Sequence, residues 1–426
     1  MGVLVVGGGI GGLVAALSLH QVGVKVKLFE RVLHARPLEV GIVLSPGAVR
    51  ELDDLGFSDL LAEIGIPLSS VAYYNRLGQG ILNEPCGLDG GYRWPQYAVP
   101  RDVLQTALVN ETRRRIGRDN VHLGCELLSF DNGEDGVSAA FRDKSQNGDV
   151  ARFDGSLMIG ADGIASTVRR SLNPQEGEPI WNGAILWRGM SRGIGLLDGR
   201  TIAVAGNDGQ KFVCYPLAGA DPDVPTVSWI AQLRFRSEHE WREEEWNRPG
   251  QPIDFLPAFE DWRFDWLDVP RLVAAAKGIY EFPMIDRDPL HGWSKNRATL
   301  LGDAAHPMHP VGTHGASEAI IDARIVARSV ALAGETAAAL TDYEIARRLT
   351  TKRITLANRQ NGPEQILQIA DERAPDGFSA VEEVAPRGEL LEMIAKYRQM
   401  AGIDAETVNG REALVPEGLR VAPVVP

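Results

Sequence analysis

A glycine fingerprint near the amino terminus constrains this chain more than any other feature. Residues 3–6 are a short, continuously apolar run, which is typical of a strand buried on both faces. Gly7-x-Gly9-x-x-Gly12 follows, and apolar residues then recur at helical spacing up to Gly23. Residues 24–30 predict a second strand that ends on Glu30. The whole pattern predicts two parallel strands joined by a right-handed helical crossover.

Each residue of this pattern suits a separate part of a dinucleotide site. Gly7 allows a tight turn, Gly9 lets the backbone approach a pyrophosphate, and Gly12 lets the helix pack closely on the strand. Phosphates sit on the helix amino terminus, and Glu30 can accept hydrogen bonds from the adenosine ribose hydroxyls. A bare glycine-rich turn is the alternative for this motif in isolation. With strand, helix and acidic terminus in place, it predicts a dinucleotide site, which fits FAD and NAD equally.

Composition excludes several other classes of protein. The chain has 426 residues and a net charge of -13, which argues against nucleic acid as a partner because phosphate binding needs clustered Lys and Arg. Its three cysteines are far apart and form no CxxC pair, so neither a disulfide framework nor a zinc site is expected. We see no signal peptide and no apolar run long enough for a membrane span, and therefore expect a cytoplasmic protein.

The chain leaves the nucleotide-binding fold and returns to it. Helices are expected over 97–116, 166–172, 317–333, 340–373 and 387–402, and buried strands over 157–159 and 298–302. Residues 180–285 alternate short β-like runs with Pro and Trp, which predicts a mostly antiparallel sheet. The acidic stretch 238–245 reads as a solvated face. We expect an α/β protein with a discontinuous Rossmann-like FAD-binding domain (1–70, 96–180 and 285–360), an inserted substrate-binding sheet domain (71–95 and 181–284), and C-terminal helices and a tail (361–426).

Two further motifs narrow the function. The first is Gly160-Ala161-Asp162-Gly163-x-x-Ser166-x-Val168-Arg169. The second runs from Gly302-Asp303-Ala304-Ala305-His306-Pro307 through Pro310-x-Gly312-x-x-Gly315-Ala316-Ser317. In this order after the glycine fingerprint, they resemble the para-hydroxybenzoate hydroxylase-like family of FAD-dependent monooxygenases, over about residues 1–360. The proline loop and Trp187-Arg188-Gly189 most resemble the branch that contains a phenazine hydroxylase.

The resemblance implies roles for individual residues. Asp303 would bind the flavin ribitol, Arg101 and Gln105 the ribitol–pyrophosphate region, and Asp162 both FAD and the nicotinamide nucleotide. Arg31, beside Glu30, is a further candidate cofactor contact. Gly315 and Ala316 would present backbone N–H groups to the flavin pyrimidine edge. A helix that begins after Gly315 supports this independently, because its dipole favours the negative charge of reduced flavin.

The candidates for the substrate cavity come from the proline loop and the sheet. Pro310 would form the wall beside the reactive flavin carbon, while Gly312, like Gly315, is a cofactor-binding candidate because it lets the backbone approach the flavin. His306 is most simply a loop or helix-capping histidine, whereas His309 or His314 could reach the substrate or carry a proton, and we expect no metal. Arg188 could pair with a substrate carboxylate or with a carboxylate of the protein. Tyr215 ends a strand and is a candidate for the cavity or for the core.

These observations predict an aromatic-ring monooxygenase. The resemblance implies bound FAD, NADH or NADPH as transient reductant, O2 as co-substrate, and hydroxylation of an aromatic or heteroaromatic small molecule, a carboxylic acid or a neutral phenol, through a flavin C4a-hydroperoxide. The alternatives are a flavin dehydrogenase or reductase of the same fold, and a non-enzymatic flavin-binding sensor or scaffold. We expect a monomer or homodimer.

Overall fold

A five-stranded parallel sheet forms the centre of the first half of the molecule. The computed structural model describes residues 1–33, 40–144, 148–219, 221–235 and 248–421; the acidic stretch 238–245 lies outside them. The strand order is β21-β12-β1-β2-β8, and every neighbouring pair is parallel. The strands are β1 (Val3–Val6), β2 (Val26–Glu30), β8 (Val121–Leu123), β12 (Leu157–Gly160) and β21 (Ala298–Leu300). The expected parallel strand, helix and strand unit is therefore present.

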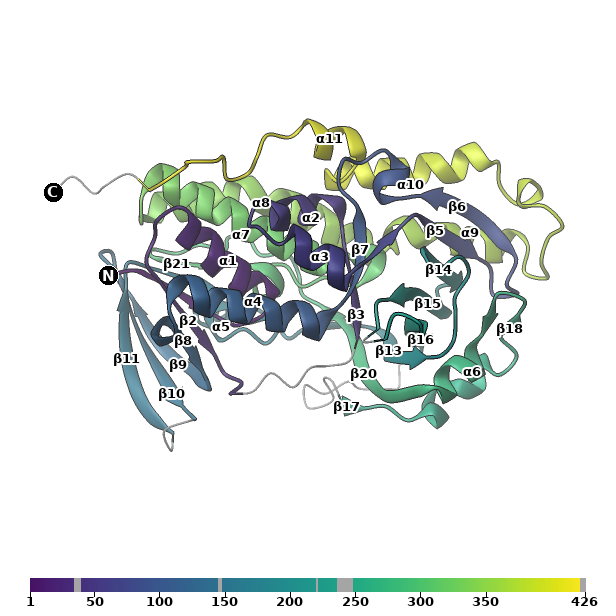
Figure 1. Cartoon of the computed structure of the whole chain (residues 1–426), viewed down its shortest axis with the longest axis horizontal. Coiled ribbons are helices and arrows are strands. Elements are labelled where there is room, and N and C mark those ends of the chain that lie inside the picture. The colour runs from purple at the N-terminus through teal and green to yellow at the C-terminus, as the bar shows by residue number, and fades with distance from the viewer. Residues whose placement is uncertain (34–39, 145–147, 220, 236–247, 422–426) are drawn as a thin grey trace.

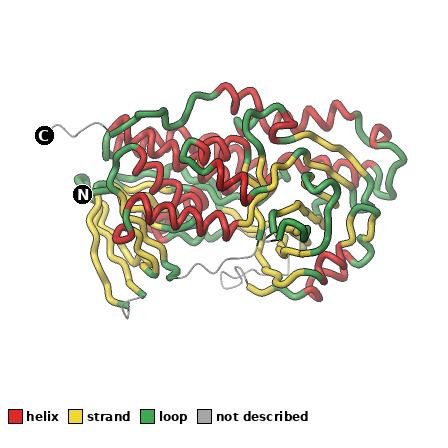
Figure 2. The backbone as a smooth tube through the Cα atoms, viewed as in Figure 1, coloured by secondary structure: helices red, strands yellow, loops and turns green. Residues whose placement is uncertain are grey.

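Helices cover this sheet, as Figures 1 and 2 show. The helix of the fingerprint, α1 (Ile10–Gln21), is buried over most of its surface because it packs between the sheet, α4 and α7. The helices of this half are α2 (Pro46–Asp53), α3 (Ser58–Ile64), α4 (Arg101–Ile116), α5 (Thr167–Leu172), α7 (Gly315–Ala333) and α8 (Ala337–Arg359). A small antiparallel sheet flanks this half, with β9 (Cys125–Asn132), β10 (Val137–Asp143) and β11 (Asp149–Gly155).

An eight-stranded sheet forms the second half of the molecule. Its order is β17-β20-β13-β16-β15-β14-β5-β6, and the pairs are antiparallel except for β14 with β5. The strands are β5 (Ser70–Tyr74), β6 (Gly80–Pro85), β13 (Ile180–Arg192), β14 (Thr201–Gly206), β15 (Gln210–Leu217), β16 (Thr226–Arg234), β17 (Arg248–Pro249) and β20 (Ala276–Asp286). Short elements beside it are α6 (Val269–Ala274), β18 (Arg263–Phe264) and β19 (Leu267–Asp268). The predicted fold class is confirmed.

Two segments connect the halves. β3 (Gly41–Leu44) and β4 (Ile66–Leu68) pair with β7 (Gln96–Pro100), which leads directly into α4. At the other end of the chain, α9 (Gln365–Arg373) and α10 (Arg387–Ala401) pack on the large sheet, and α11 (Ala405–Gly410) follows them (Figure 1).

The helix expected over 340–373 is interrupted, and this prediction was wrong in one respect. α8 ends at Arg359, and Asn361 takes a left-handed conformation with φ of 62° before α9 begins at Gln365. The stretch from Asn358 to Gln365 has no large apolar residue and contains Gly362-Pro363, a dipeptide that marks turns, so the sequence carries a local signal for this break. The break places Glu364 against the proline loop.

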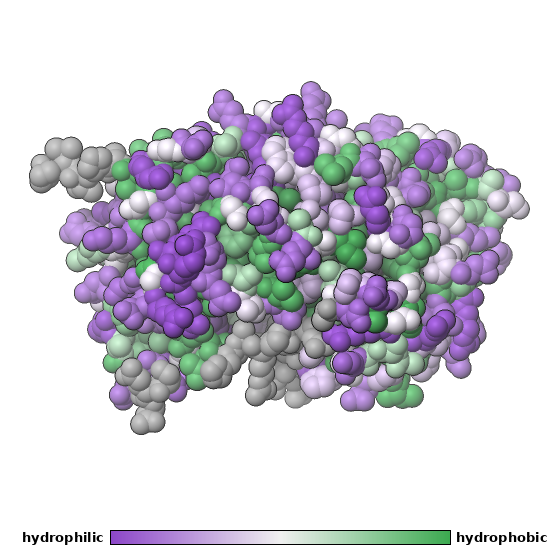
Figure 3. All heavy atoms as spheres, in the orientation of Figure 1, coloured by the Kyte–Doolittle hydropathy of each residue, from purple (hydrophilic) through white to green (hydrophobic). Residues whose placement is uncertain are grey.

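The surface of the molecule is mixed in character. On the face drawn in Figure 3, hydrophilic side chains spread over both halves and apolar ones lie between them, which is ordinary for a globular protein. In the described part of the chain, no helix combines the length and apolar character that a membrane span requires.

Candidate flavin site

The three fingerprint glycines stand in three different environments. A Cβ on Gly7, which has φ of 111°, would lie 2.2 Å from the Ala161 carbonyl oxygen, and one on Gly12 would lie 2.0 Å from the Gly7 carbonyl oxygen. Among the residues that the structure describes, a Cβ on Gly9 would meet no atom within 4 Å. Gly7 and Gly12 therefore serve packing, whereas Gly9 borders open space. Gly9 also precedes α1, whose amino terminus has no side-chain cap, so the first N–H groups of the helix are available to an anion.

Polar side chains from two other elements hold this loop. Glu30, at the end of β2, accepts hydrogen bonds from the N–H of Gly8 (2.6 Å) and of Val32 (2.8 Å). Since a carboxylate has about four acceptor positions, it retains capacity for ribose hydroxyls. Gln105 of α4 donates through Nε2 to the Gly8 carbonyl oxygen (2.9 Å). Arg31 is exposed beside Glu30.

Arg101 lies close enough to Asp303 of the first half and to Arg188 of the large sheet to interact electrostatically with both. Arg101 begins α4, and its pKa is lowered by burial and by the nearby Arg188, while Asp303 opposes both effects. Asp303 has solvent-accessible surface, yet burial raises the pKa of its carboxyl against the influence of His306 and Arg101. The two findings agree if Asp303 lines an internal recess, where water reaches a side chain that protein surrounds. This region has an excess of positive charge and suits an anionic ligand.

Asp162 caps a helix. Its carboxylate accepts hydrogen bonds from the N–H of Thr167 (2.8 Å) and Val168 (3.2 Å) in α5, and from the Ser166 hydroxyl. Burial raises the pKa of the Asp162 carboxyl although these bonds oppose the shift. Asp162 also adjoins the glycine fingerprint, since its backbone N lies 2.9 Å from the position of a Cβ on Gly7.

The loop from His309 to Ala316 leads into α7. Gly312 and Thr313 have φ of 67° and 61°, and Pro310 is exposed. No side chain caps α7, and a Cβ on Gly315 would come no nearer than 4.0 Å to another group, the Asp303 Oδ1 atom. The loop therefore brings a free helix amino terminus beside Asp303.

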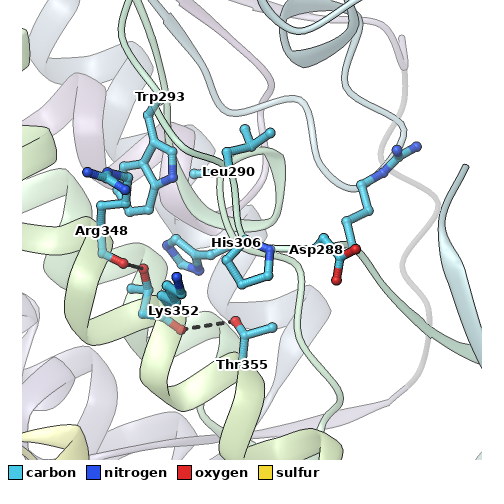
Figure 4. Close-up of a pocket in the computed structure, with 11 residues that line it drawn as sticks. Asp288, Leu290, Trp293, His306, Arg348, Lys352 and Thr355 are labelled. Atoms are coloured by element: carbon cyan, nitrogen blue, oxygen red, sulfur yellow. Dashed lines mark hydrogen bonds between the residues drawn. The ribbon is translucent and has the colours of Figure 1, made fainter. Parts of the chain in front are cut away.

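The histidines of this loop, and His306 just before it, are buried. His306 forms a 2.5 Å contact through Nε2 with Asp322 Oδ2. Burial by itself raises the pKa of Asp322, but His306 and Arg347 together outweigh it and lower that pKa to about 2. Figure 4 shows His306 beside Trp293 at a cavity of about 10 Å³, which holds about one water and no substrate. Within the described residues, no group of three His, Cys, Asp or Glu side chains is placed to hold a metal.

His309 and His314 have different surroundings. Neither ring nitrogen of His309 forms a hydrogen bond to a described residue, and its Nε2 is 3.7 Å from Asp286 Oδ2. His314 stacks on Tyr397, with ring centroids 5.6 Å apart. Burial lowers the pKa of both histidines, so both are held neutral.

Arg188 lies on the face of the large sheet that meets this loop. It alternates with Leu186 along β13, and Leu186 packs in one cluster with Phe282 and with Val311 of the loop. The Arg188 guanidinium is half-buried, donates to the Gly41 carbonyl oxygen (3.2 Å), and stands 5.9 Å from the centre of the Phe282 ring. Within the described residues, Arg188 Nε has no hydrogen-bond partner and no carboxylate pairs with Arg188.

Sequence reasoning missed Gly41, which joins the two halves. A Cβ on Gly41 would lie 2.7 Å from Tyr215 Cε2 and 2.9 Å from Ser228 Oγ, and the Gly41 N–H donates to that hydroxyl (3.1 Å). Tyr215 is thereby packed and almost fully buried. A glycine within the apolar run Val40-Gly41-Ile42-Val43 was the available signal, because such a glycine often marks close approach of another segment.

Comparison with known proteins decides what this arrangement is. An FAD binding domain model matches residues 1–184. A phenazine 1,6-dicarboxylic acid hydroxylase (PhzS) from Lysobacter antibioticus is 38% identical over 361 residues, which cover 84% of this chain and 89% of the relative. The chain belongs to the para-hydroxybenzoate hydroxylase-like family of FAD-dependent monooxygenases.

Other relatives of this monooxygenase agree. A 3-hydroxybenzoate 6-hydroxylase from Aquipseudomonas alcaligenes is 28% identical, with 84% of this chain and 87% of the relative covered. The fold matches that of a Klebsiella pneumoniae HpxO variant complexed with FAD, with a TM-score of 0.69, 23% identity and 96% of each chain covered. The predicted FAD, NAD(P)H and O2 dependence and the monooxygenase class are confirmed, in preference to a reductase or a sensor.

The residues of the monooxygenase fit FAD. The open space at Gly9, the uncapped amino termini of α1 and α7, and the cationic surroundings of Arg101 suit a pyrophosphate and an electron-rich isoalloxazine edge. A separate recess of about 420 Å³ opens between the end of α8 and the large sheet, and no predicted site residue lines it.

Proposed function

We propose that this monooxygenase hydroxylates an aromatic or heteroaromatic carboxylic acid whose carboxylate pairs with Arg188. The observation that carries the proposal is the Arg188 guanidinium, which is half-buried without a described carboxylate partner on the face that meets the proline loop. A buried charge without a partner is costly, so a ligand that supplies the partner gains both charge pairing and hydrogen bonding. The phenazine 1,6-dicarboxylic acid hydroxylase, at 38% identity, is named for a substrate of this kind.

The proposal assigns separate residues to binding FAD and to orienting the substrate. We propose that Gly9, Glu30, Arg31, Arg101, Gln105, Asp162 and Asp303 hold FAD, and that Gly315 and Ala316 present the amino terminus of α7 to its pyrimidine edge. Bound FAD supplies the electron transfer and oxygen activation. The chain orients the substrate ring and excludes water, which otherwise diverts the oxygen to hydrogen peroxide. The overall reaction consumes NAD(P)H, a proton, O2 and the arene, and releases NAD(P)⁺, the phenol and water.

The sheet supplies the substrate wall in this proposal. Leu186, Ile230 and Phe282 present apolar surface beside Arg188, which suits a planar ring with one charged substituent. Pro310 is exposed at the start of the facing loop. His309 is the candidate for a proton carrier there, because it is neutral and its ring nitrogens are free of hydrogen bonds.

The test pairs each aromatic acid with its neutral amide. Oxidation of NADH and NADPH, O2 consumption and hydroxylated product are measured for both compounds. Acids stimulate the wild type, and Arg188→Met raises KM for the best acid by about ten- to a hundredfold, since a charged hydrogen bond contributes roughly 1.5–3 kcal/mol. Arg192→Met, at the exposed end of the same strand, is the matched control and leaves KM unchanged. Equal stimulation by acids and amides contradicts the carboxylate assignment and favours a neutral phenol.

A further inference from the structure

The loop from His309 to Gly315 contains a strained backbone conformation and needs contacts from other segments to keep it. Thr313 has φ of 61°, although β-branched residues rarely adopt the left-handed region, and Gly312 has φ of 67°. Glycine adopts this conformation readily, but Thr313 is strained in it, and such strain persists only where the surroundings over-determine the backbone. The contacts that hold this loop are therefore as important to the flavin site as the loop itself.

The C-terminal part of the chain supplies one group of contacts. Asn358, near the end of α8, donates through Nδ2 to the carbonyl oxygens of His309 (3.1 Å) and Val311 (3.3 Å). The Tyr397 hydroxyl of α10 donates to Asn358 Oδ1 (2.8 Å), and the Tyr397 ring stacks on His314. These residues fix the carbonyl side of the loop.

A buried ion pair supplies the contact on the amide side. Glu364 Oε1 accepts a hydrogen bond from the Gly312 N–H (3.2 Å), and Glu364 Oε2 pairs with Lys211 Nζ. The side chains of Lys211 and Glu364 are only 4% and 9% exposed. Lys211 lies on β15, two residues before Val213, which packs with Val311 of the loop. The pair therefore links the substrate sheet, the break between α8 and α9, and the flavin loop.

The energetics of this pair argue for a role beyond stability. Desolvation of two charges costs several kcal/mol, and buried pairs replaced by apolar residues of similar volume are often no less stable. What apolar residues cannot reproduce is the acceptor for the Gly312 N–H. We propose that Glu364 is a positioning residue of the monooxygenase, which sets the loop beneath the flavin through Gly312, and that Lys211 holds Glu364 in place.

This inference rests on the proposed function, because it places the flavin against the loop. Its test compares two double variants of the holoenzyme, K211M/E364Q and K211M/E364M. Both remove the buried charges, and Gln and Met are nearly equal in size, so the two differ in the acceptor for Gly312. The readouts are the visible circular dichroism of bound FAD, the product formed per NAD(P)H oxidised, and the unfolding temperature of the apoprotein.

K211M/E364Q retains the wild-type visible circular dichroism of FAD and the wild-type coupling, that is, the product formed per NAD(P)H oxidised. The Met variant changes the spectrum, and its product yield falls about fivefold, a loss of about 1 kcal/mol in positioning, while the two unfold at similar temperatures. Equal spectra and yields in the two variants overturn the role of Glu364. If wild type binds FAD and hydroxylates nothing, the proposed function fails, whereas the spectral comparison still decides this inference.

The single variant K211M tests the role of Lys211. It leaves the Glu364 carboxylate buried without its cation, so coupling falls in K211M and recovers when E364Q is added. A yield in K211M equal to wild type overturns the role of Lys211. E51Q is the matched control, because Glu51 and Arg324 form another fully buried pair, between α2 and α7. E51Q lowers the unfolding temperature without changing the flavin spectrum.

Discussion

The glycine loop after β1 and the proline loop before α7 both lead into an uncapped helix amino terminus, but they are held in opposite ways. In the first, backbone contacts as short as 2.0 Å from a hypothetical Cβ leave room for glycine alone at Gly7 and Gly12. In the second, side chains from α8 and α10 and Glu364, between α8 and α9, hold the loop, and Lys211 of β15 reaches Glu364 across 153 positions of sequence. The first loop owes its shape to local sterics, and the second to tertiary contacts.

The largest expected effect breaks the first loop. Gly12→Ala places a Cβ against the Gly7 carbonyl oxygen, and we expect a loss of roughly 3 kcal/mol in the free energy of unfolding with at least about hundredfold weaker FAD binding. Gly9→Ala is the matched control, since its Cβ meets no protein atom. It leaves the unfolding temperature of the apoprotein unchanged and weakens FAD binding alone. Flavin titration of the two apoproteins measures their FAD affinity. Wild-type affinity in Gly9→Ala would falsify the pyrophosphate role of Gly9.

Gly41→Ala tests the junction between the two halves. Its Cβ collides with Tyr215 and Ser228, so we expect a loss of roughly 1–3 kcal/mol in unfolding free energy from overpacking. The displaced Gly41 carbonyl also disturbs Arg188, and kcat/KM falls further than FAD affinity. Denaturant unfolding measures the free energy of unfolding, and steady-state kinetics measure kcat/KM. Unaltered kinetics with lowered stability would show that Gly41 serves packing only.

Tyr397→Phe removes one support of the second loop and keeps another. The ring still stacks on His314, while the hydrogen bond to Asn358 is lost. We expect a loss of about 1 kcal/mol in stability, the typical net contribution of one hydrogen bond, and a smaller product yield per NAD(P)H oxidised. Tyr343→Phe is the control, because the Tyr343 hydroxyl bonds the Leu300 carbonyl oxygen, away from the loop. An equal fall in product yield in Tyr397→Phe and Tyr343→Phe contradicts a specific role of Tyr397 in supporting the loop.

The smallest expected effect is a pH dependence at His314. Burial lowers its pKa below the ordinary value of 6.5, an effect that Glu318 and Glu364 oppose and Arg398 reinforces. Stability from neutral His314 is complete above that ordinary value and is lost as the pH falls towards the lower folded pKa, because the unfolded chain binds the proton first. His314→Phe removes this loss, so the stability of the variant falls less on acidification than that of the wild type. The measurement is the unfolding free energy of both proteins from about pH 7.5 to about pH 5. Equal slopes of this free energy against pH would show that His314 is not involved.

Much of the fold could be predicted because its signals are local. The strand, turn and helix around Gly7 to Gly23 follow from apolar periodicity and glycine sterics, and the parallel sheet follows from the crossover rule. The interruption of the helix at Asn361 was missed although Gly362-Pro363, directly after it, is a local turn signal. The pairing of Glu364 with Gly312 was missed for a different reason, since nothing near Glu364 in the sequence indicates a partner.

The sequence by itself determined the class of this protein: a dinucleotide fold, an FAD-dependent monooxygenase, and the residues of the glycine fingerprint. The dinucleotide fold could be predicted because each fingerprint residue acts on its immediate neighbours and backbone sterics permit few alternatives. The monooxygenase class followed from the resemblance of the three motifs, in their order, to a known family. The tertiary structure alone decided that Arg188 faces the proline loop, that Gly41 supports it, and that Lys211 and Glu364 meet behind Gly312. Such contacts depend on how distant segments pack together, and a lone buried charge carries no sequence pattern from which its partner can be inferred.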